Sequence, residues 1–193
     1  MYKDLVKLIE EQLAEQEVVV IAISGHGGSG KSTLAEKLAQ QFNIAKNQII
    51  QSDALHAKDY MQTRDLFGMH DWDSIFELLA NIRNDDRLNY TKRDDKEIES
   101  VVDIPRPRLV IIEGIRLIRP EILPFVDESI WVDCPLEIAT MRAKERNRQQ
   151  GDSEAEIALW DSKWAPEAKL YFEQVKPDKI SSFIYRDQGL TLT

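Results

Sequence analysis

Short apolar runs alternate along this chain with stretches whose apolar residues recur at helical spacing. The runs are rich in β-branched residues, a pattern typical of strands that are buried on both faces. We predict five strands, at residues 18–24, 48–51, 109–112, 129–132 and 183–185. Helical periodicity predicts helices at residues 1–16, 34–42, 74–84, 119–123, 136–149 and 155–174.

Strands that are separated by helices predict a particular class of fold. Such a chain forms a mostly parallel sheet with helices on both faces, because each crossover needs a connection of helical length. We therefore expect an α/β fold with three layers and a five-stranded sheet, in a single domain spanning residues 1–193. The heavily charged segment 84–108 ends in Pro105-Arg106-Pro107, and we interpret it as an irregular excursion from the sheet that forms either a lid or a wall on the acceptor side.

A phosphate-binding motif follows the first predicted strand. The run Gly25-His26-Gly27-Gly28-Ser29-Gly30-Lys31-Ser32 fits G-x-x-x-x-G-K-[ST] at every fixed position. The alternative is a glycine-rich turn that binds nothing, but the strand before the run and the helix after it are the context that the motif requires. The sequence therefore predicts a P-loop that binds a nucleoside triphosphate.

The chemistry of this loop divides between backbone and side chains. Glycines let the backbone N–H groups turn inward around an anion, and the helix N-terminus adds its positive dipole end. Lys31 is expected to reach the β- and γ-phosphates, Ser32 to ligate Mg²⁺, and Thr33 to donate to an α-phosphate oxygen. The residues predicted to bind ATP are Gly25, His26, Gly27, Gly28, Ser29, Gly30, Lys31, Ser32, Thr33 and Arg142.

Acidic residues follow three of the predicted strands. In an open α/β sheet, ligands bind beyond the carboxyl ends of the strands, so these positions converge with the loop. Asp53 is placed to act as general base toward an acceptor hydroxyl, and Glu113 to hold Mg²⁺ through coordinated water. Each could instead cap the next helix, and we prefer that interpretation for Asp133, since Cys134-Pro135 leads directly into a helix.

Composition limits the partners and the compartment. The 193 residues carry a net charge of −9, which argues against a nucleic-acid partner and favours a small-molecule substrate. No apolar run approaches the ~20 residues that span a bilayer, and residues 1–16 are amphipathic rather than a secretory signal, so we expect a cytoplasmic protein. The lone Cys134 fits a reducing compartment and a small buried side chain better than a nucleophile. Nothing in the pattern indicates the oligomeric state.

Four cations gather in one short stretch of this acidic chain, at Arg142, Lys144, Arg146 and Arg148. A solvated helix surface is one interpretation. The other is a lid over the triphosphate at about 142–151, because Arg142 and Arg146 share a helix face and Arg146 would meet the transferring phosphate.

The motifs together resemble the uridine kinase and phosphoribulokinase branch of P-loop kinases. The resemblance is carried by residues 21–35 around the P-loop and by Val110-Ile111-Ile112-Glu113-Gly114-Ile115. Asp53 stands where that family has its catalytic aspartate, in a motif usually written D-S-F-Y that here reads Asp53-Ala54-Leu55-His56. Met141-Arg142 and Arg146 resemble the lid arginines, and Trp164, Glu167, Tyr171 and Phe172 resemble a helix before the closing strand.

The resemblance also implies an acceptor site. His70-Asp71-Trp72-Asp73 is similar to the segment that walls it, and Tyr90 with Asp94 is similar to a Y-x-x-Y-D element in which Arg93 replaces the second tyrosine. A core role for Trp72, and surface positions for His56 and His70, are the alternatives. The acceptor residues that the resemblance implies are His56, Trp72, Asp73, Tyr90 and Asp94.

The resemblance implies transfer of the γ-phosphoryl group from ATP, with Mg²⁺, to a hydroxyl of a nucleoside-like or related metabolite. Because the sequence departs from the family at His56 and Arg93, uridine, pantothenate, nicotinamide riboside and sugar phosphates all remain open as acceptors. A nucleotide-binding regulator, or a degenerate kinase that phosphorylates no metabolite, is the alternative function. The chain contains neither the N-K-x-D of GTPases nor a transport-type glycine-rich signature.

Overall fold

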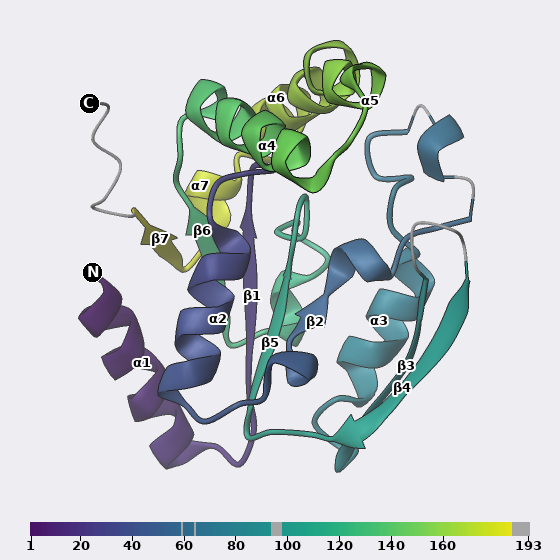
Figure 1. The fold of residues 1–193 in the computed structure, drawn as a ribbon. Coiled ribbons are helices and arrows are strands. Elements are labelled where there is room, and N and C mark those ends of the chain that lie inside the picture. The colour runs from purple at the N-terminus through teal and green to yellow at the C-terminus, as the bar shows by residue number, and fades with distance from the viewer. Residues whose placement is uncertain (59, 64, 94–97, 187–193) are drawn as a thin grey trace.

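Strand β1 (Val19–Gly25) is the centre of a five-stranded sheet in the computed structural model, which describes residues 1–58, 60–63, 65–93 and 98–186. The strand order is β2-β5-β1-β6-β7, and every pairing is parallel. The other strands are β2 (Ile50–Gln51), β5 (Leu109–Gly114), β6 (Glu128–Val132) and β7 (Phe183–Tyr185). The predicted α/β architecture with a mostly parallel five-stranded sheet is confirmed (Figure 1).

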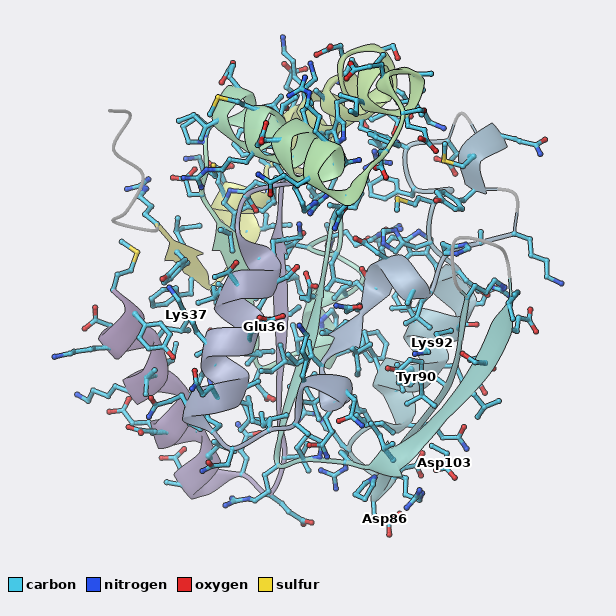
Figure 2. All side chains as sticks on the ribbon, in the orientation of Figure 1. Glu36, Lys37, Asp86, Tyr90, Lys92 and Asp103 are labelled. Atoms are coloured by element: carbon cyan, nitrogen blue, oxygen red, sulfur yellow. The ribbon has the colours of Figure 1, made fainter. Side chains whose placement is uncertain are left out.

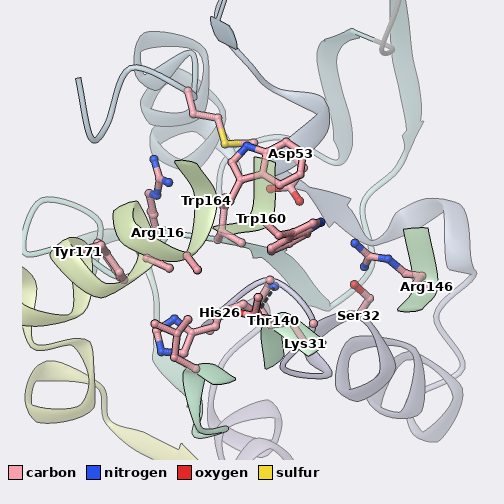
Figure 3. Close-up of a pocket in the computed structure, with 18 of the residues that line it drawn as sticks. His26, Lys31, Ser32, Asp53, Arg116, Thr140, Arg146, Trp160, Trp164 and Tyr171 are labelled. Atoms are coloured by element: carbon pink, nitrogen blue, oxygen red, sulfur yellow. Dashed lines mark hydrogen bonds between the residues drawn. The ribbon is translucent and has the colours of Figure 1, made fainter. Parts of the chain in front are cut away.

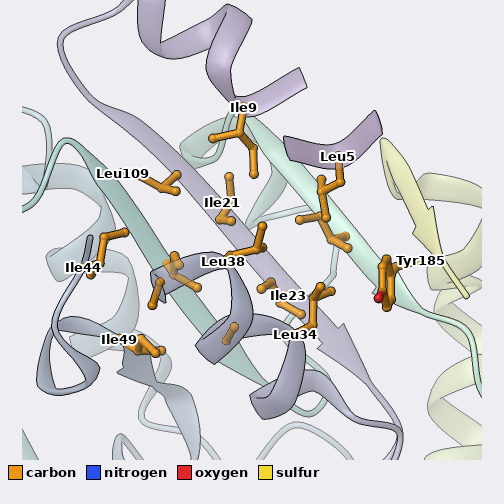
Figure 4. Packing of buried hydrophobic residues seen from close by; sticks show 14 of the residues in the cluster. Leu5, Ile9, Ile21, Ile23, Leu34, Leu38, Ile44, Ile49, Leu109 and Tyr185 are labelled. Carbon is orange, nitrogen blue, oxygen red and sulfur yellow. The ribbon is translucent and has the colours of Figure 1, made fainter. Parts of the chain in front are cut away.

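Side chains of β1 alternate between two buried layers, as the two-residue period of a strand requires. Ile21 and Ile23 point into the layer covered by α1 (Tyr2–Glu15) and α2 (Lys31–Gln41), where Leu5, Ile9, Leu34 and Leu38 meet them (Figure 4). Val20 and Ala22 point into the opposite layer, which is covered by α3 (Trp72–Asn81). The hydrophobic pattern of one strand therefore explains both faces of the sheet.

Helices from the second half of the chain cover the carboxyl ends of the strands (Figure 1). The predicted helix 155–174 is divided by a π-helical turn at Trp160–Trp164. A third apolar cluster, centred on Trp131 and Tyr171, packs this region against the sheet. The helices are α4 (Leu136–Gln150), α5 (Glu154–Leu159), α6 (Ala165–Val175) and α7 (Pro177–Ile180). The predicted lid segment 142–151 is the continuous second half of α4 together with Gly151.

The prediction of an irregular segment at 84–108 was wrong in detail. This stretch leaves the main sheet, as expected, but forms an antiparallel pair of strands, β3 (Arg87–Arg93) and β4 (Glu99–Pro105). Leu88 and Ile104 pair across the ladder and pack on the α3 layer. The alternation of apolar and polar residues that is typical of strands was not recognised in the sequence, because the outer face of these two strands is strongly charged.

Two local predictions also need correction. Instead of the helix predicted at 119–123, residues 120–122 form a turn, which a 3₁₀ turn follows at Leu123–Phe125. Pro120 and Pro124 explain this, since neither can donate the backbone hydrogen bond of a helix. The second strand is shorter than predicted, because Lys46–Gln48 is a 3₁₀ turn.

Asp133 does not cap the following helix, contrary to our preferred interpretation. In the described structure Pro135 occupies the N-cap of α4 without a side-chain hydrogen bond, and Asp133 instead accepts from Arg186 Nε at 2.7 Å. Cys134 is buried, as expected for a small apolar side chain. Among the described residues, no helix has both the length and the apolar character needed to traverse a bilayer.

Candidate active site

The glycine-rich loop joins β1 to the first turn of α2 and is shaped by two left-handed glycines. Gly28 has φ 84° and Gly30, the N-cap of α2, has φ 97°, a region that L-residues rarely adopt. A Cβ atom on Gly28 would lie 2.1 Å from the carbonyl oxygen of Ala139 in α4. Only glycine fits here, so the loop and α4 pack backbone to backbone.

Lys31 is buried at the start of α2, and its Nζ donates a hydrogen bond to the carbonyl oxygen of His26 at 3.2 Å. Burial lowers the pKa of this ammonium group, while the nearby carboxylates of Asp53 and Glu113 act in the opposite direction. The lysine is thus held inside the loop beside two carboxylates, where a phosphate group would be attracted to it.

The His26 side chain points away from the loop into the protein. Its ring meets Trp131 edge to face, with 5.2 Å between centroids, and lies 5.8 Å from Phe172. Burial, followed by the positive charge of Lys31, lowers the pKa of the imidazole to about 4. His26 is therefore neutral at physiological pH and serves the loop through its backbone and its packing.

Ser32 and Glu113 form a pair of oxygen donors next to Lys31. The Ser32 hydroxyl donates to Glu113 Oε1 at 3.0 Å. Burial and the proximity of Asp53 raise the pKa of Glu113, while Lys31 and Ser32 oppose the shift. Hydroxyl and carboxylate oxygens are the hard ligands that Mg²⁺ prefers, so the donor set fits that cation. Among the described residues, no three or more histidine, cysteine or acidic side chains are grouped so that they could hold a metal ion by themselves.

Asp53 lies in a 3₁₀ turn (Ser52–Ala54) directly after β2. The turn approaches β5 so closely that a Cβ atom on Gly114 would be 1.7 Å from Ser52 Oγ, which accounts for glycine at that position. On the other side, the buried His70 places Nε2 3.1 Å from Ser52 Oγ and 3.8 Å from Asp53 Oδ1. These contacts fix Asp53 at the carboxyl end of the sheet.

The Asp53 side chain is 56% exposed, and it faces a cavity rather than open solvent. Shielding from bulk water raises its pKa, but the nearby His70 imidazole and the charge of Lys31 outweigh that effect and hold the pKa below its usual value. The carboxyl is therefore ionised at neutral pH and able to accept a proton.

One cavity of about 310 Å³ brings the loop and the strand ends together (Figure 3). Eight predicted site residues from the loop, from the turn after β2 and from α4 line this cavity. They are Gly25, His26, Gly27, Gly28, Lys31, Ser32, Asp53 and Arg146. Four other predicted site residues do not line it: Ser29, Gly30, Thr33 and Glu113.

The predicted acceptor residues are not all brought together. His56 lines the cavity, with its ring 4.6 Å from that of Tyr60. Trp72 donates from Nε1 to the carbonyl of Phe67 at 2.7 Å and is stacked under the Arg119 guanidinium, outside the cavity lining. Asp73 is exposed in the first turn of α3. The core interpretation of Trp72 thus agrees with its packing.

Tyr90, a further predicted acceptor residue, belongs to strand β3 of the β3–β4 hairpin. Tyr90 is half-buried and packs toward α3, away from the P-loop (Figure 2). Asp94 lies outside the described residues. Arg93, the departure from the family pattern, donates to the carbonyl of His56 at 2.7 Å and pairs with Glu99 at 3.0 Å. The hairpin therefore contacts the cavity wall indirectly, through the hydrogen bond from Arg93 to the backbone of His56.

The cationic stretch of α4 divides between the cavity and the surface. Arg146 lines the cavity, whereas Arg142 is exposed and outside its lining. Arg148 pairs with Glu145 and Glu154 at the surface. The helix buries Ala139, Ala143 and Asn147, and the two arginines, which are both exposed, differ in that Arg146 lies further along α4, where the helix borders the cavity.

Several cavity residues were missed from the sequence. Trp160 and Trp164 of the π-helical turn line one wall. Arg116 lies two residues after Gly114 with φ 55°, a strained conformation for arginine that tends to occur at functional sites. Its guanidinium donates to the carbonyl of Leu66 and to Glu167 Oε2, both at 2.6 Å. The aromatic pair in Trp160-Asp161-Ser162-Lys163-Trp164 was the available signal, but the sequence analysis gave these residues only a place in a predicted helix.

Comparison with known proteins gives consistent matches. The profile of the AAA domain family matches residues 21–159. A uridine kinase from Histophilus somni is 22% identical over 193 residues, covering 92% of this chain and 90% of that protein. A uridine kinase from Halalkalibacterium halodurans is 28% identical over 146 residues, covering 69% of each.

Solved structures share the fold at low sequence identity. A putative fructose transport system kinase from Silicibacter sp. TM1040 superposes with a TM-score of 0.76 at 21% identity, covering 96% of this chain and 98% of that one. A possible uridine kinase from Bacillus stearothermophilus gives 0.67 at 17% identity, with 95% and 98% coverage. The resemblance to the uridine kinase-like P-loop kinases is confirmed, and the chain belongs to the AAA domain family, whose profile covers most of its length.

Proposed function

We propose that this protein is an ATP-dependent kinase that transfers the γ-phosphoryl group to a hydroxyl of a small metabolite. The observation that carries the proposal is the single cavity lined by the P-loop residues Lys31 and Ser32 on one side and by the ionised Asp53 on the other. A phosphate donor and a proton-accepting group are the two parts that phosphoryl transfer to an alcohol requires.

Each side chain has a role in the proposed transfer. Asp53 accepts the proton of the acceptor hydroxyl as its oxygen attacks the γ-phosphorus, the bond from that phosphorus to the β,γ-bridging oxygen breaks, and ADP leaves. Lys31 and Arg146 stabilise the negative charge on the transferring group. Ser32 and Glu113 would hold Mg²⁺, which when bound neutralises phosphate charge.

The acceptor is proposed to be nucleoside-like or a related hydroxylated metabolite. Support comes from the relatives named uridine kinase and from the solved fold named as a putative fructose transport system kinase. In the acceptor half of the cavity, the guanidinium of Arg116 is already paired with Glu167 at 2.6 Å. Because this cation is already neutralised, the arrangement favours an acceptor that carries no strong negative charge.

The experiment is ADP release from Mg·ATP, measured with the full chain and one candidate acceptor at a time. The panel contains uridine, cytidine, fructose, pantothenate, nicotinamide riboside and ribose 5-phosphate. We expect one compound to raise ADP release well above the acceptor-free rate, with the phosphorylated product detected by mass spectrometry. Tight Mg·ATP binding with no acceptor-dependent turnover across an extended panel would support the regulatory alternative instead.

A further inference from the structure

The π-helical turn Trp160–Trp164 places two indole rings against the same cavity. The ring centroids lie 4.9 Å apart at an angle of 70°. π-Helical turns within α-helices are rare and occur frequently at functional sites. In Figure 3, Trp164 lies beside Asp53, whereas Trp160 lies between the P-loop and Arg146. The two tryptophans therefore face different parts of the site.

Trp160 rests directly on the phosphate-binding loop. A Cβ atom on Gly27 would lie 2.5 Å from Cη2 and 2.8 Å from Cζ3 of the Trp160 ring. Such proximity means that the ring edge touches the backbone of Gly27. The other cavity residues on this side are Lys31, Ser32, Thr140 and Arg146, which carry ammonium, hydroxyl and guanidinium groups suited to phosphate.

The indole nitrogen of Trp160 is a buried donor that has no hydrogen-bond partner among the described residues. Buried N–H groups nearly always have a partner, and one that lacks it costs free energy that a ligand can recover. Figure 3 shows this nitrogen at the end of the ring that is nearer Arg146, over the side of the loop that contains Ser32. The donor thus lies at the end of the cavity that is lined by Ser32 and Arg146.

Contacts on either side of Trp160 hold the turn in place. Lys144 of α4 donates to both carboxylate oxygens of Asp161, at 2.5 and 2.6 Å. Lys163 donates to the carbonyl of Met61 at 2.7 Å. The turn is therefore tied to α4 and to the 60–63 segment, which fixes where the indole ring sits.

We propose that Trp160 is a further phosphate-binding residue, whose indole N–H donates a hydrogen bond to a phosphate oxygen of the bound nucleotide. The inference rests on the nucleotide-binding part of the proposed function but not on transfer to an acceptor. The hydrogen bond would be charge-assisted and would add a donor from the second half of the chain to those of the loop backbone. Trp164, beside Asp53, is not part of this contact.

The test uses ¹⁵N-labelled tryptophan in the full chain, which contains four tryptophans and hence four indole N–H signals. The signal missing from Trp160→Phe identifies Trp160. We expect it to move downfield when Mg·AMP-PNP or Mg·ADP saturates the protein and to stay in place with adenosine, which has no phosphate. Trp72, whose N–H is already bonded to Phe67, supplies an internal reference.

The matched variants are Trp160→Phe and Trp164→Phe, which each remove one indole N–H from the same turn and keep an aromatic ring. We expect the Kd for Mg·AMP-PNP to rise about 10-fold in Trp160→Phe, the scale of a lost hydrogen bond to a charged group. In Trp164→Phe the Kd should rise less than in Trp160→Phe, because Trp164 lies beside Asp53 rather than over the phosphate-binding loop.

Each outcome of these measurements is decisive. A Trp160 signal that is unchanged by Mg·AMP-PNP, or that moves equally with adenosine, overturns the inference even if the enzyme phosphorylates a metabolite. Movement only on addition of a phosphorylatable acceptor assigns the N–H to that acceptor and also overturns it. Absence of Mg·AMP-PNP binding by wild type in calorimetry contradicts the proposed function and the inference together. Binding with the expected shift but without turnover would leave the inference standing and contradict only the transfer.

Discussion

His70 Nε2 lies 3.8 Å from Asp53 Oδ1, at the end of a buried imidazole that comes from 17 positions further along the chain. An isolated antiparallel bridge between His56 and His70 brings it there. The imidazole also contacts Ser52 Oγ at 3.1 Å and therefore holds the whole turn after β2. The proton-accepting group of the proposed reaction is thus oriented by a residue that does not line the cavity.

Asp53→Asn should slow phosphoryl transfer by about 10²-fold or more, because the amide keeps the shape of the side chain but accepts no proton. Affinity for Mg·ATP should persist, since the contacts of the loop are unchanged. Single-turnover rates and calorimetric affinities separate the two effects. A variant with normal turnover would show that the base lies elsewhere.

Lys31→Ala should abolish detectable transfer while the chain remains folded. The ammonium group supplies charge to the transferring phosphoryl group, and the hydrogen bond that it loses is one contact to the His26 carbonyl. Turnover is the readout, and circular dichroism with thermal unfolding is the control for folding. Turnover at the wild-type rate would remove the P-loop from the mechanism.

Arg146→Ala should reduce the transfer rate by about 10²-fold or more and weaken ADP binding much less, because its charge matters most in the transition state. Arg146→Lys should give a partial defect, since lysine keeps the charge but loses the planar fork. Arg142→Ala serves as the control from the same helix, and its position outside the cavity lining predicts a small effect. Equal defects at both arginines would contradict the assignment of this role to Arg146 alone.

His26 predicts a pH dependence of stability. Its pKa falls from 6.5 to about 4 on folding, mainly through burial, so between these values the unfolded chain binds a proton that the folded chain does not. The free energy of unfolding therefore contains a contribution from His26 of about 3 kcal/mol. This contribution is fully present above pH 6.5 and is lost as the pH falls toward 4. Urea unfolding from pH 7 to 4 should show this component in wild type and not in His26→Phe. Parallel pH profiles for the two proteins would contradict the assignment.

Much of the site could be predicted from the sequence because it is built from local patterns. The P-loop needs only a strand, a turn and a helix within about 25 residues, and all three have strong signals between Val18 and Phe42. Asp53 and Glu113 could be placed because parallel strands bring their carboxyl ends to one edge. In the structure both carboxylates lie close enough to Lys31 to influence its pKa, as the expected convergence of the strand ends requires.

Contacts between segments far apart in the chain could not be predicted from the sequence. Hydrophobic periodicity shows that Trp72 has an apolar neighbourhood, but not that Arg119 covers its ring at 4.6 Å. It predicts a helix through Trp160, but not the π-helical turn that sets the ring on Gly27, more than 130 positions earlier. The sequence by itself determined the phosphate-binding chemistry, because backbone geometry and dipoles are local. Only the tertiary structure decided which aromatic and cationic side chains face the cavity, because that depends on packing between elements far apart in the chain.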